Sequence, residues 1–185
     1  IVLFYILNMK INIIHNFSKE EAFSVGLILL MVFSRLIPHP PNFTPIIATG
    51  ILCGYFFKDL KLSLFVLLIS MLLSDLFIGF YSNMIFVYLF IILITLLAFK
   101  LNSKINIKNL FLYGLAGSFL FYLISNFGVW ILGNLYPKNM GGLIECYFMA
   151  IPFFKNTLIS TTIFIYLVFI LKKAINAFFL KNITQ

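Results

Sequence analysis

Long apolar stretches alternate with short polar segments along the whole chain. Six stretches stand out, at residues 21–37, 43–57, 62–81, 84–99, 110–133 and 157–180. A helix needs roughly 20 residues to cross about 30 Å of hydrocarbon, so the pattern predicts an all-α integral membrane protein with a bundle of about six transmembrane helices. The second stretch is short, and we expect its backbone to be broken or only partly embedded after Pro45.

Composition supports the membrane interpretation and limits the alternatives. Of the 185 residues, 63% are hydrophobic and only 10% are charged, which is far from the usage of soluble domains. The net charge is +8, but the lysines stand singly or in pairs between apolar stretches, so they indicate topology rather than nucleic-acid binding. "MKINIIHNFSKEE", which begins at Met9, is typical of a natural start. We therefore expect residues 1–8 to be an upstream extension and residues 9–185 to form one domain.

The distribution of lysines predicts the orientation in the membrane. With six crossings both termini lie on one side, and the loops and ends on that side carry ten lysines, against two on the other. Because cytoplasmic loops are rich in Lys and Arg, both termini are predicted to be cytoplasmic. All six prolines, the single Trp, and Arg35, Asp75 and Glu145 then belong to the external half.

Arg35 and Asp75 are charged residues within apolar stretches. A charge inside a membrane helix costs about 2.5 to 3.5 kcal/mol, so each needs water, a partner or a ligand. One interpretation is that Arg35 snorkels to the membrane surface. The other is that Arg35 and Asp75 face each other or a shared cavity, where the guanidinium binds a ligand carboxylate or phosphate.

The external loop between the first two stretches has the sequence "RLIPHPPNFTP" (residues 35–45). Four prolines fix much of its backbone and are expected to hold it largely extended. His39 and Asn42 are therefore candidate ligand-binding residues on a rigid loop. The alternative is a sharp turn with a solvated His39.

Further polar candidates lie near the outer end of the fifth stretch. Asn126, Trp130 and Asn134 are four residues apart, which places them on one helical face, and Tyr136 follows. This face of amide, indole and amide suits a flat polar ligand, and Asn126, Trp130 and Tyr136 are the candidate binding residues. An interfacial aromatic belt explains Trp130 and Tyr136 equally well. Glu145 lies in the segment 137–156, which is expected to be a loop whose apolar part either covers the cavity or packs on the bundle.

Small residues form a second pattern. Ala22 with Gly26, Gly50 with Gly54, and Gly114 with Gly117 and Ser118 are each three or four residues apart, which permits close helix contact. Internal packing is the simplest interpretation. Ala22 and Gly26 could instead mark an outer face on which a partner helix docks.

Four blocks carry a family resemblance: "RLIPHPPNFTPIIATGILCGYFF", "SDLFIGFYSNMIFVYL", "GSFLFYLISNFGVWILGNLYP" and "GGLIECYFMAIPFFKNTL". They resemble a family of small uncharacterised six-helix bacterial membrane proteins, and through it the substrate-binding S components of energy-coupling-factor (ECF) vitamin transporters. The resemblance implies a cytoplasmic-membrane subunit that binds a vitamin-like metabolite in an external cavity roofed by the loop between helices 1 and 2. It also implies a transmembrane coupling protein and ATPases as partners, with docking through positions that Ala22 and Gly26 match in part.

A scaffold or assembly protein of a membrane complex, without a small-molecule ligand, is the alternative function. Catalysis is not expected, because Asp59 and Asp75 are predicted on opposite sides and no nucleophile motif accompanies His39. A metal site and a bound cofactor are not expected either. The chain has no P-loop motif with which to hydrolyse ATP itself.

Overall fold

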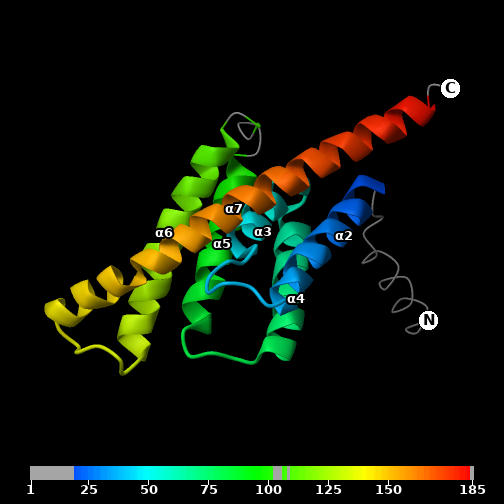
Figure 1. Ribbon diagram of the computed structural model, residues 1–185. Helices are drawn as coiled ribbons and strands as arrows, with labels where there is room; N and C mark the ends of the chain where they lie inside the picture. Colours follow the sequence, from blue (N-terminus) through cyan, green and yellow to red (C-terminus); the bar gives the residue numbers. More distant parts are fainter. Residues whose placement is uncertain (1–18, 102–105, 108, 184–185) are drawn as a thin grey trace, which may run out of the picture.

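The computed structural model describes residues 19–101, 106–107 and 109–183, and within them every regular element is helical. Figure 1 shows the arrangement. The elements are α2 (Lys19–Phe33), η1 (Ser34–Leu36), α3 (Ile46–Phe56), α4 (Leu60–Ile78), α5 (Met84–Lys100), α6 (Leu110–Leu132) and α7 (Met140–Ile183). The all-α prediction is confirmed, and each apolar stretch contains most or part of one helix. The expected extension at residues 1–8 lies outside the described residues.

Three of these helices are long and apolar enough to cross a membrane by length and composition: α4, α6 and the Met140–Ala174 part of α7. The other apolar helices are shorter. Large apolar side chains cover much of the outside, for example Leu30, Phe77 and Phe148, each at least 70% exposed. Ser, Thr and Asp side chains are instead buried between helices. This distribution suits a chain whose surroundings are apolar.

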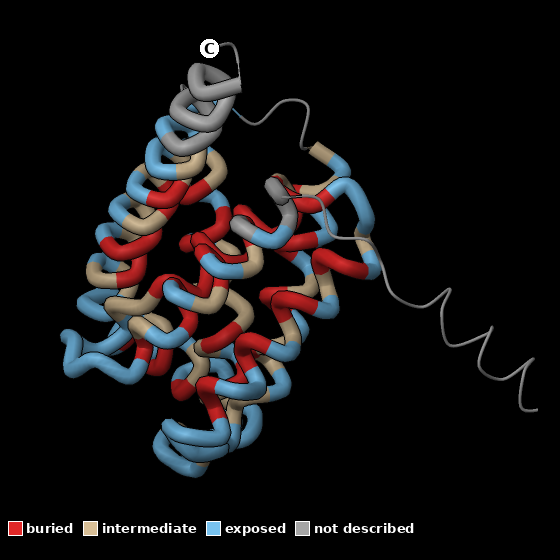
Figure 2. The backbone as a smooth tube through the Cα atoms, turned by 90° about the vertical axis from the view of Figure 1, so that its right-hand side faces the viewer, coloured by how far each residue is buried: buried red, intermediate tan, exposed pale blue. Residues whose placement is uncertain are grey.

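Helix α3 lies at the centre of the bundle. Buried residues lie on the inner sides of the helices (Figure 2). Nearly all of the 11 residues of α3 are buried, and it contacts α2, α4, α5, α6 and α7. Pro45 sets its start, because a proline fits the beginning of a helix, and Thr49 N–H donates to the Pro45 carbonyl at 2.7 Å. The helix is short, as expected, but the expectation of a broken backbone after Pro45 is wrong, because α3 is continuous from Ile46 to Phe56. At 1.5 Å per residue, α3 is about 16 Å long, roughly half the thickness of a hydrocarbon layer.

Glycines allow α5 to approach α3 closely. A Cβ at Gly54 would lie 2.5 Å from the Thr95 carbonyl oxygen, and one at Gly50 would lie 2.5 Å from the Ile94 side chain. Thr95 Oγ1 also donates to the Gly50 carbonyl at 2.9 Å. Gly50 and Gly54 therefore form an internal seam, as the sequence pattern suggests.

Gly26 on α2 differs from the seam glycines. No atom lies within 4 Å of the position a Cβ would take there, and Ala22 and Gly26 are both exposed. The interpretation of this pair as an internal seam is wrong, because α2 packs on α3 and α4 through another face. Ala22 and Gly26 lie on the outside of the bundle.

Helix α7 corrects the prediction for residues 137–156. The helix begins at Met140 and continues through Pro152 for 44 residues, so the expected loop is limited to the short connection after α6. Pro152 cannot donate a hydrogen bond within the helix, and the part of α7 that precedes it is held against α6. Tyr122 donates to the Tyr147 carbonyl at 2.6 Å, and Tyr147 donates to the Leu123 carbonyl at 2.8 Å.

The Gly54 contact yields a direct test of the seam. Gly54→Ala should lower the free energy of unfolding by about 1 to 3 kcal/mol, because the added methyl group meets backbone atoms of α5. The matched control Gly26→Ala should be neutral or stabilise by up to about 1 kcal/mol, since its methyl group meets no atom and Gly is a poor helix former. Unfolding in detergent, followed by circular dichroism, measures both. Equal effects of the two substitutions would contradict the seam.

Candidate functional site

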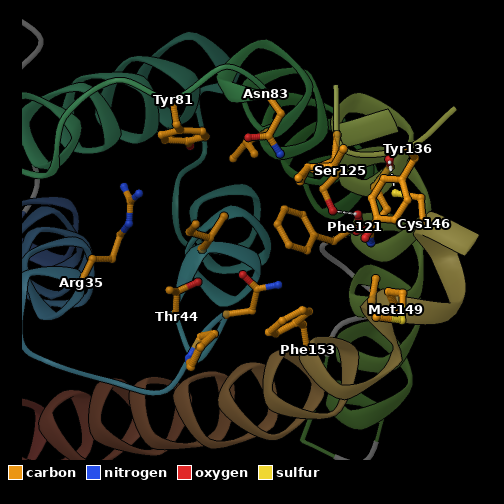
Figure 3. Close-up of a pocket in the computed structure, with 18 of the residues that line it drawn as sticks. Arg35, Thr44, Tyr81, Asn83, Phe121, Ser125, Tyr136, Cys146, Met149 and Phe153 are labelled. Atoms are coloured by element: carbon orange, nitrogen blue, oxygen red, sulfur yellow. Dashed lines mark hydrogen bonds between the residues drawn. The ribbon is translucent and has the colours of Figure 1, made fainter. Parts of the chain in front are cut away.

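A cavity of about 540 Å³ lies beside the N-terminal end of α3 and is partly open (Figure 3). Its walls come from η1, the loop 37–45, the start of α5, the second half of α6, the α6–α7 connection and the first part of α7. The lining mixes polar and aromatic side chains. It includes Arg35, His39, Asn42, Thr44, Tyr81, Asn83, Phe121, Ser125, Asn126, Tyr136, Cys146 and Phe153.

Arg35 and Asp75 form an ion pair at one wall of this cavity. Arg35 Nη2 lies 2.8 Å from Asp75 Oδ1, and their side chains are 6% and 0% exposed. Arg35 Nη1 donates to Ser74 Oγ at 2.5 Å. Asp75 Oδ2 accepts from the Tyr88 hydroxyl at 2.8 Å. The predicted pairing is present, and the snorkelling interpretation of Arg35 is wrong because the guanidinium points into the bundle.

The contact at Asp75 Oδ1 is ionic in character. Despite the 2.8 Å distance to Arg35, no donor within the described residues meets Oδ1 at a hydrogen-bonding angle. The charge of Asp75 is therefore compensated mainly by the Arg35 guanidinium. Removing only one partner would leave the other as an unpaired buried charge, which is strongly destabilising.

Tyr81 extends this cluster into the cavity. It lies in the connection between α4 and α5 and lines the cavity close to Arg35 in Figure 3. Burial, together with the Asp75 carboxylate, raises the pKa of Tyr81 to about 12, although the Arg35 guanidinium acts in the opposite direction. The hydroxyl is therefore protonated at neutral pH and can donate a hydrogen bond to a ligand.

The proline-rich loop places His39 and Asn42 at the cavity. Phe43 N–H donates to the Pro40 carbonyl at 3.0 Å, and Asn42 has a φ of 59°. Pro41 followed by Asn42 at positive φ is the sequence preferred by a type II turn. The expected extended backbone is therefore interrupted by a tight turn. His39 is exposed at the cavity edge, with Nδ1 2.9 Å from the Pro40 carbonyl oxygen.

Side chains of α7 hold the far side of this loop. Asn156 Nδ2 donates to the Pro41 carbonyl at 3.0 Å, and Ser160 Oγ donates to the Thr44 carbonyl at 3.1 Å. Thr157 Oγ1 lies 3.5 Å from the Asn42 carbonyl oxygen. The loop is thus attached to α7 through its backbone, which leaves the Asn42 side chain at the cavity.

The predicted polar face of α6 is divided by the structure. Asn126 and Tyr136 line the cavity, and Asn126 Nδ2 donates to the Tyr122 carbonyl at 2.7 Å. Trp130 does not line it. Its indole N–H donates to the Pro137 carbonyl at 2.9 Å, and Lys138 Nζ bonds the Trp130 carbonyl. Trp130 therefore stabilises the α6–α7 connection, because Pro137 and Lys138 of this connection fold back onto Trp130 and bond to it.

Glu145 also lies away from the cavity. It is exposed on the outer face of α7, whereas its neighbour Cys146 lines the cavity. Successive helical residues are about 100° apart, so the helix that replaces the expected loop turns Glu145 outward. Within the described residues, no cluster of His, Cys, Asp and Glu suits a metal ion, and Cys53 and Cys146 are both free.

Several lining residues did not stand out in the sequence. They are Thr44, Tyr81, Asn83, Phe121, Ser125 and Phe153. Asn83 and Tyr81 occur in "SDLFIGFYSNM", a segment without lysine that the lysine distribution predicts to be external, and this is their one signal in the sequence. Phe121, Ser125 and Phe153 are residue types found throughout apolar helices, so only the three-dimensional arrangement identifies them.

The fold and the site define an all-helical, strongly apolar protein with a polar cavity beneath a proline-rich loop. The chain belongs to DUF6580, a family of unknown function, whose family model matches residues 15–181. No curated protein and no solved structure gives a significant match. The cavity itself is therefore the guide to function.

The ion pair makes a specific prediction about stability. Arg35→Gln and Asp75→Asn should each lower the free energy of unfolding by about 3 to 5 kcal/mol, because each leaves a buried charge unpaired. The double variant R35Q/D75N should lose much less than the sum, since neither charge remains. Chemical unfolding in detergent micelles measures the cycle. The control Glu145→Gln, on an exposed face, should change stability by less than about 0.5 kcal/mol. Additive effects at Arg35 and Asp75 would show that the two side chains are not coupled.

Proposed function

We propose that this chain is a membrane-embedded solute-binding subunit, similar to ECF S components, that serves the uptake of a small vitamin-like metabolite. The observation that carries the proposal is the cavity of about 540 Å³, which polar groups from several segments line and which has the buried Arg35 at one wall. Ligand sites are typically concave, of about 300 to 1,000 Å³, and combine apolar walls with a few placed polar groups.

The proposed placement in the membrane follows from the apolar surface and the lysines. All six helices form the transmembrane bundle, both termini lie in the cytoplasm, and the cavity opens outward. Because α3 is only 11 residues long, it covers about half of the hydrocarbon thickness. The cavity and the loop 37–45 occupy the outer half above it. A solute would thus bind from the external side.

Uptake against a gradient needs an energy source that this chain does not contain. The sequence has no P-loop motif, so the proposal includes a coupling protein and ATPases as partners. Ala22 and Gly26 are available for docking, since they lie on the exposed face of α2 and no atom lies within 4 Å of the Gly26 Cβ position. The same exposed face is the observation that favours the alternative, a scaffold protein of a membrane complex.

Native mass spectrometry of the protein purified from its own membrane tests the proposal. We expect a retained small molecule together with co-purifying ATPases. Asn126→Leu should reduce its occupancy by at least about tenfold, because an amide at the cavity wall is replaced by an apolar side chain. The matched control Asn134→Leu, outside the cavity lining, should leave the occupancy unchanged.

Two other outcomes would contradict solute binding. One is an empty protein with a stoichiometric partner that is not an ATPase, which would establish the scaffold function. The other is a retained molecule whose occupancy falls equally in both asparagine variants, which would place it outside the cavity.

A further inference from the structure

The charges around the cavity define which solutes it can hold. We infer that it selects a small planar organic anion, with one carboxylate or phosphate group beside Arg35, and that it rejects cations. This inference rests on the proposed solute-binding function and narrows it to a chemical class of ligand. It is carried by two features at the same wall, namely the orientation of the ion pair and the uncapped start of α3.

The ion pair presents its positive end to the cavity. Arg35 is the one Arg or Lys among the lining residues that the structure describes, and no carboxylate lines the cavity. Asp75 is completely buried behind Arg35, where it also accepts from Tyr88. The pair as a whole is neutral, but its dipole places the guanidinium toward the bound solute. An anion is attracted by this arrangement and a cation is repelled.

The Arg35 guanidinium has more N–H donors than its contacts within the protein use. A guanidinium carries five N–H groups; Arg35 contacts Ser74, Met71 and Asp75, and it also interacts with the Tyr81 hydroxyl. Asp75 and Ser74 fix its orientation, so little side-chain freedom remains to be lost when a ligand binds. Tyr81, beside Arg35 in Figure 3, adds a hydroxyl donor to the same wall.

The start of α3 contributes donors of its own. Pro45 at the N-cap has no side-chain acceptor, and the N–H groups of Ile46, Ile47 and Ala48 have no hydrogen-bond acceptor within the described part of the chain. All three residues are buried, and Ile46 lines the cavity. The positive end of the helix dipole therefore adds to the potential of Arg35. Among these three residues only Ile46 lines the cavity, so the Ile46 end of α3 is the part that faces a bound anion.

The rest of the lining suits a flat ring system. Phe121, Phe153 and Tyr136 supply aromatic surface around the cavity (Figure 3). The lining also contains three amide side chains, from Asn42, Asn83 and Asn126. Each amide can donate and accept hydrogen bonds, so it can bind the polar edge of a ligand ring. The anionic group and the ring are recognised by different walls, so a ligand needs both for full affinity.

Three probes of the same shape but different charge test the inference: naphthalene-2-carboxylate, naphthalene-2-carboxamide and 2-naphthylmethylammonium. Each is titrated against the full chain in phosphatidylcholine nanodiscs, and the dissociation constant is taken from the shift of the unfolding midpoint. We expect the carboxylate to bind at least about tenfold more tightly than the carboxamide, and the ammonium probe to bind most weakly. In R35Q/D75N, which retains no lone buried charge, the preference should fall to within about threefold.

The outcomes separate this inference from the proposed function. Equal binding of the carboxylate and the carboxamide to the parent protein overturns the anion preference but leaves the cavity as a solute site. A preference that persists in R35Q/D75N overturns the role of the Arg35 wall. Failure of all three probes, together with an empty native mass spectrum, overturns both proposals.

A lipid headgroup is a second possible source of the anion, and a further titration identifies it. The carboxylate probe is titrated again in nanodiscs that contain phosphatidylglycerol. Competition by phosphatidylglycerol supports the anionic site and assigns it to a lipid phosphate. Unchanged affinity supports a soluble anion.

Discussion

The buried ion pair between Arg35 and Asp75 connects the elements that surround the cavity. Arg35 belongs to the turn that leads into the proline-rich loop, Asp75 belongs to the last turns of α4, and Tyr88 of α5 bonds the same carboxylate. Both charges are almost inaccessible, so neither is tolerable without the other. A single electrostatic contact thus fixes where the loop starts relative to two helices, and with it the position of the cavity wall.

The short α3 determines where a cavity can exist at all. Ten of its residues are buried, and the glycine seam with α5 keeps the helix at the centre of the bundle. The residues that precede α3 form a loop and do not extend the helix. The space that two more helical turns would fill is therefore open, and side chains from α6 and α7 line it. Side chains of α7 bond the Pro41 and Thr44 carbonyls, which satisfies polar backbone groups of this non-helical segment.

The helices were predictable because apolar length is a strong signal, and the internal glycine seam was predictable because its spacing is regular. The start of α7 was not, since Gly141, Gly142 and Pro152 all indicate a break in isolation. The hydrogen bonds of Tyr122 and Tyr147, which hold this part of α7 against α6, become visible only in the structure. That error also misplaced Glu145, because a loop residue can point anywhere, whereas a helical register directs it outward.

The candidate site was predictable only where a residue is unusual for its surroundings. Arg and Asp are rare in apolar helices, and Asn126 lies deep in one, so the sequence alone marks Arg35, Asp75 and Asn126 as candidate site residues. The prediction that Trp130 lines the cavity is wrong. Helical spacing gives the direction of its side chain, but it does not reveal that the α6–α7 connection folds back and accepts the indole N–H. Phe121 and Phe153 are ordinary in a chain with 24 phenylalanines, so the sequence could not distinguish ring surface at a cavity from ring surface against the surroundings. Such a sequence therefore predicts the charged groups of a cavity, but it does not predict the shape of the cavity. It follows that the charge preference of the cavity is a firmer basis for identifying its ligand than the outline of its aromatic walls.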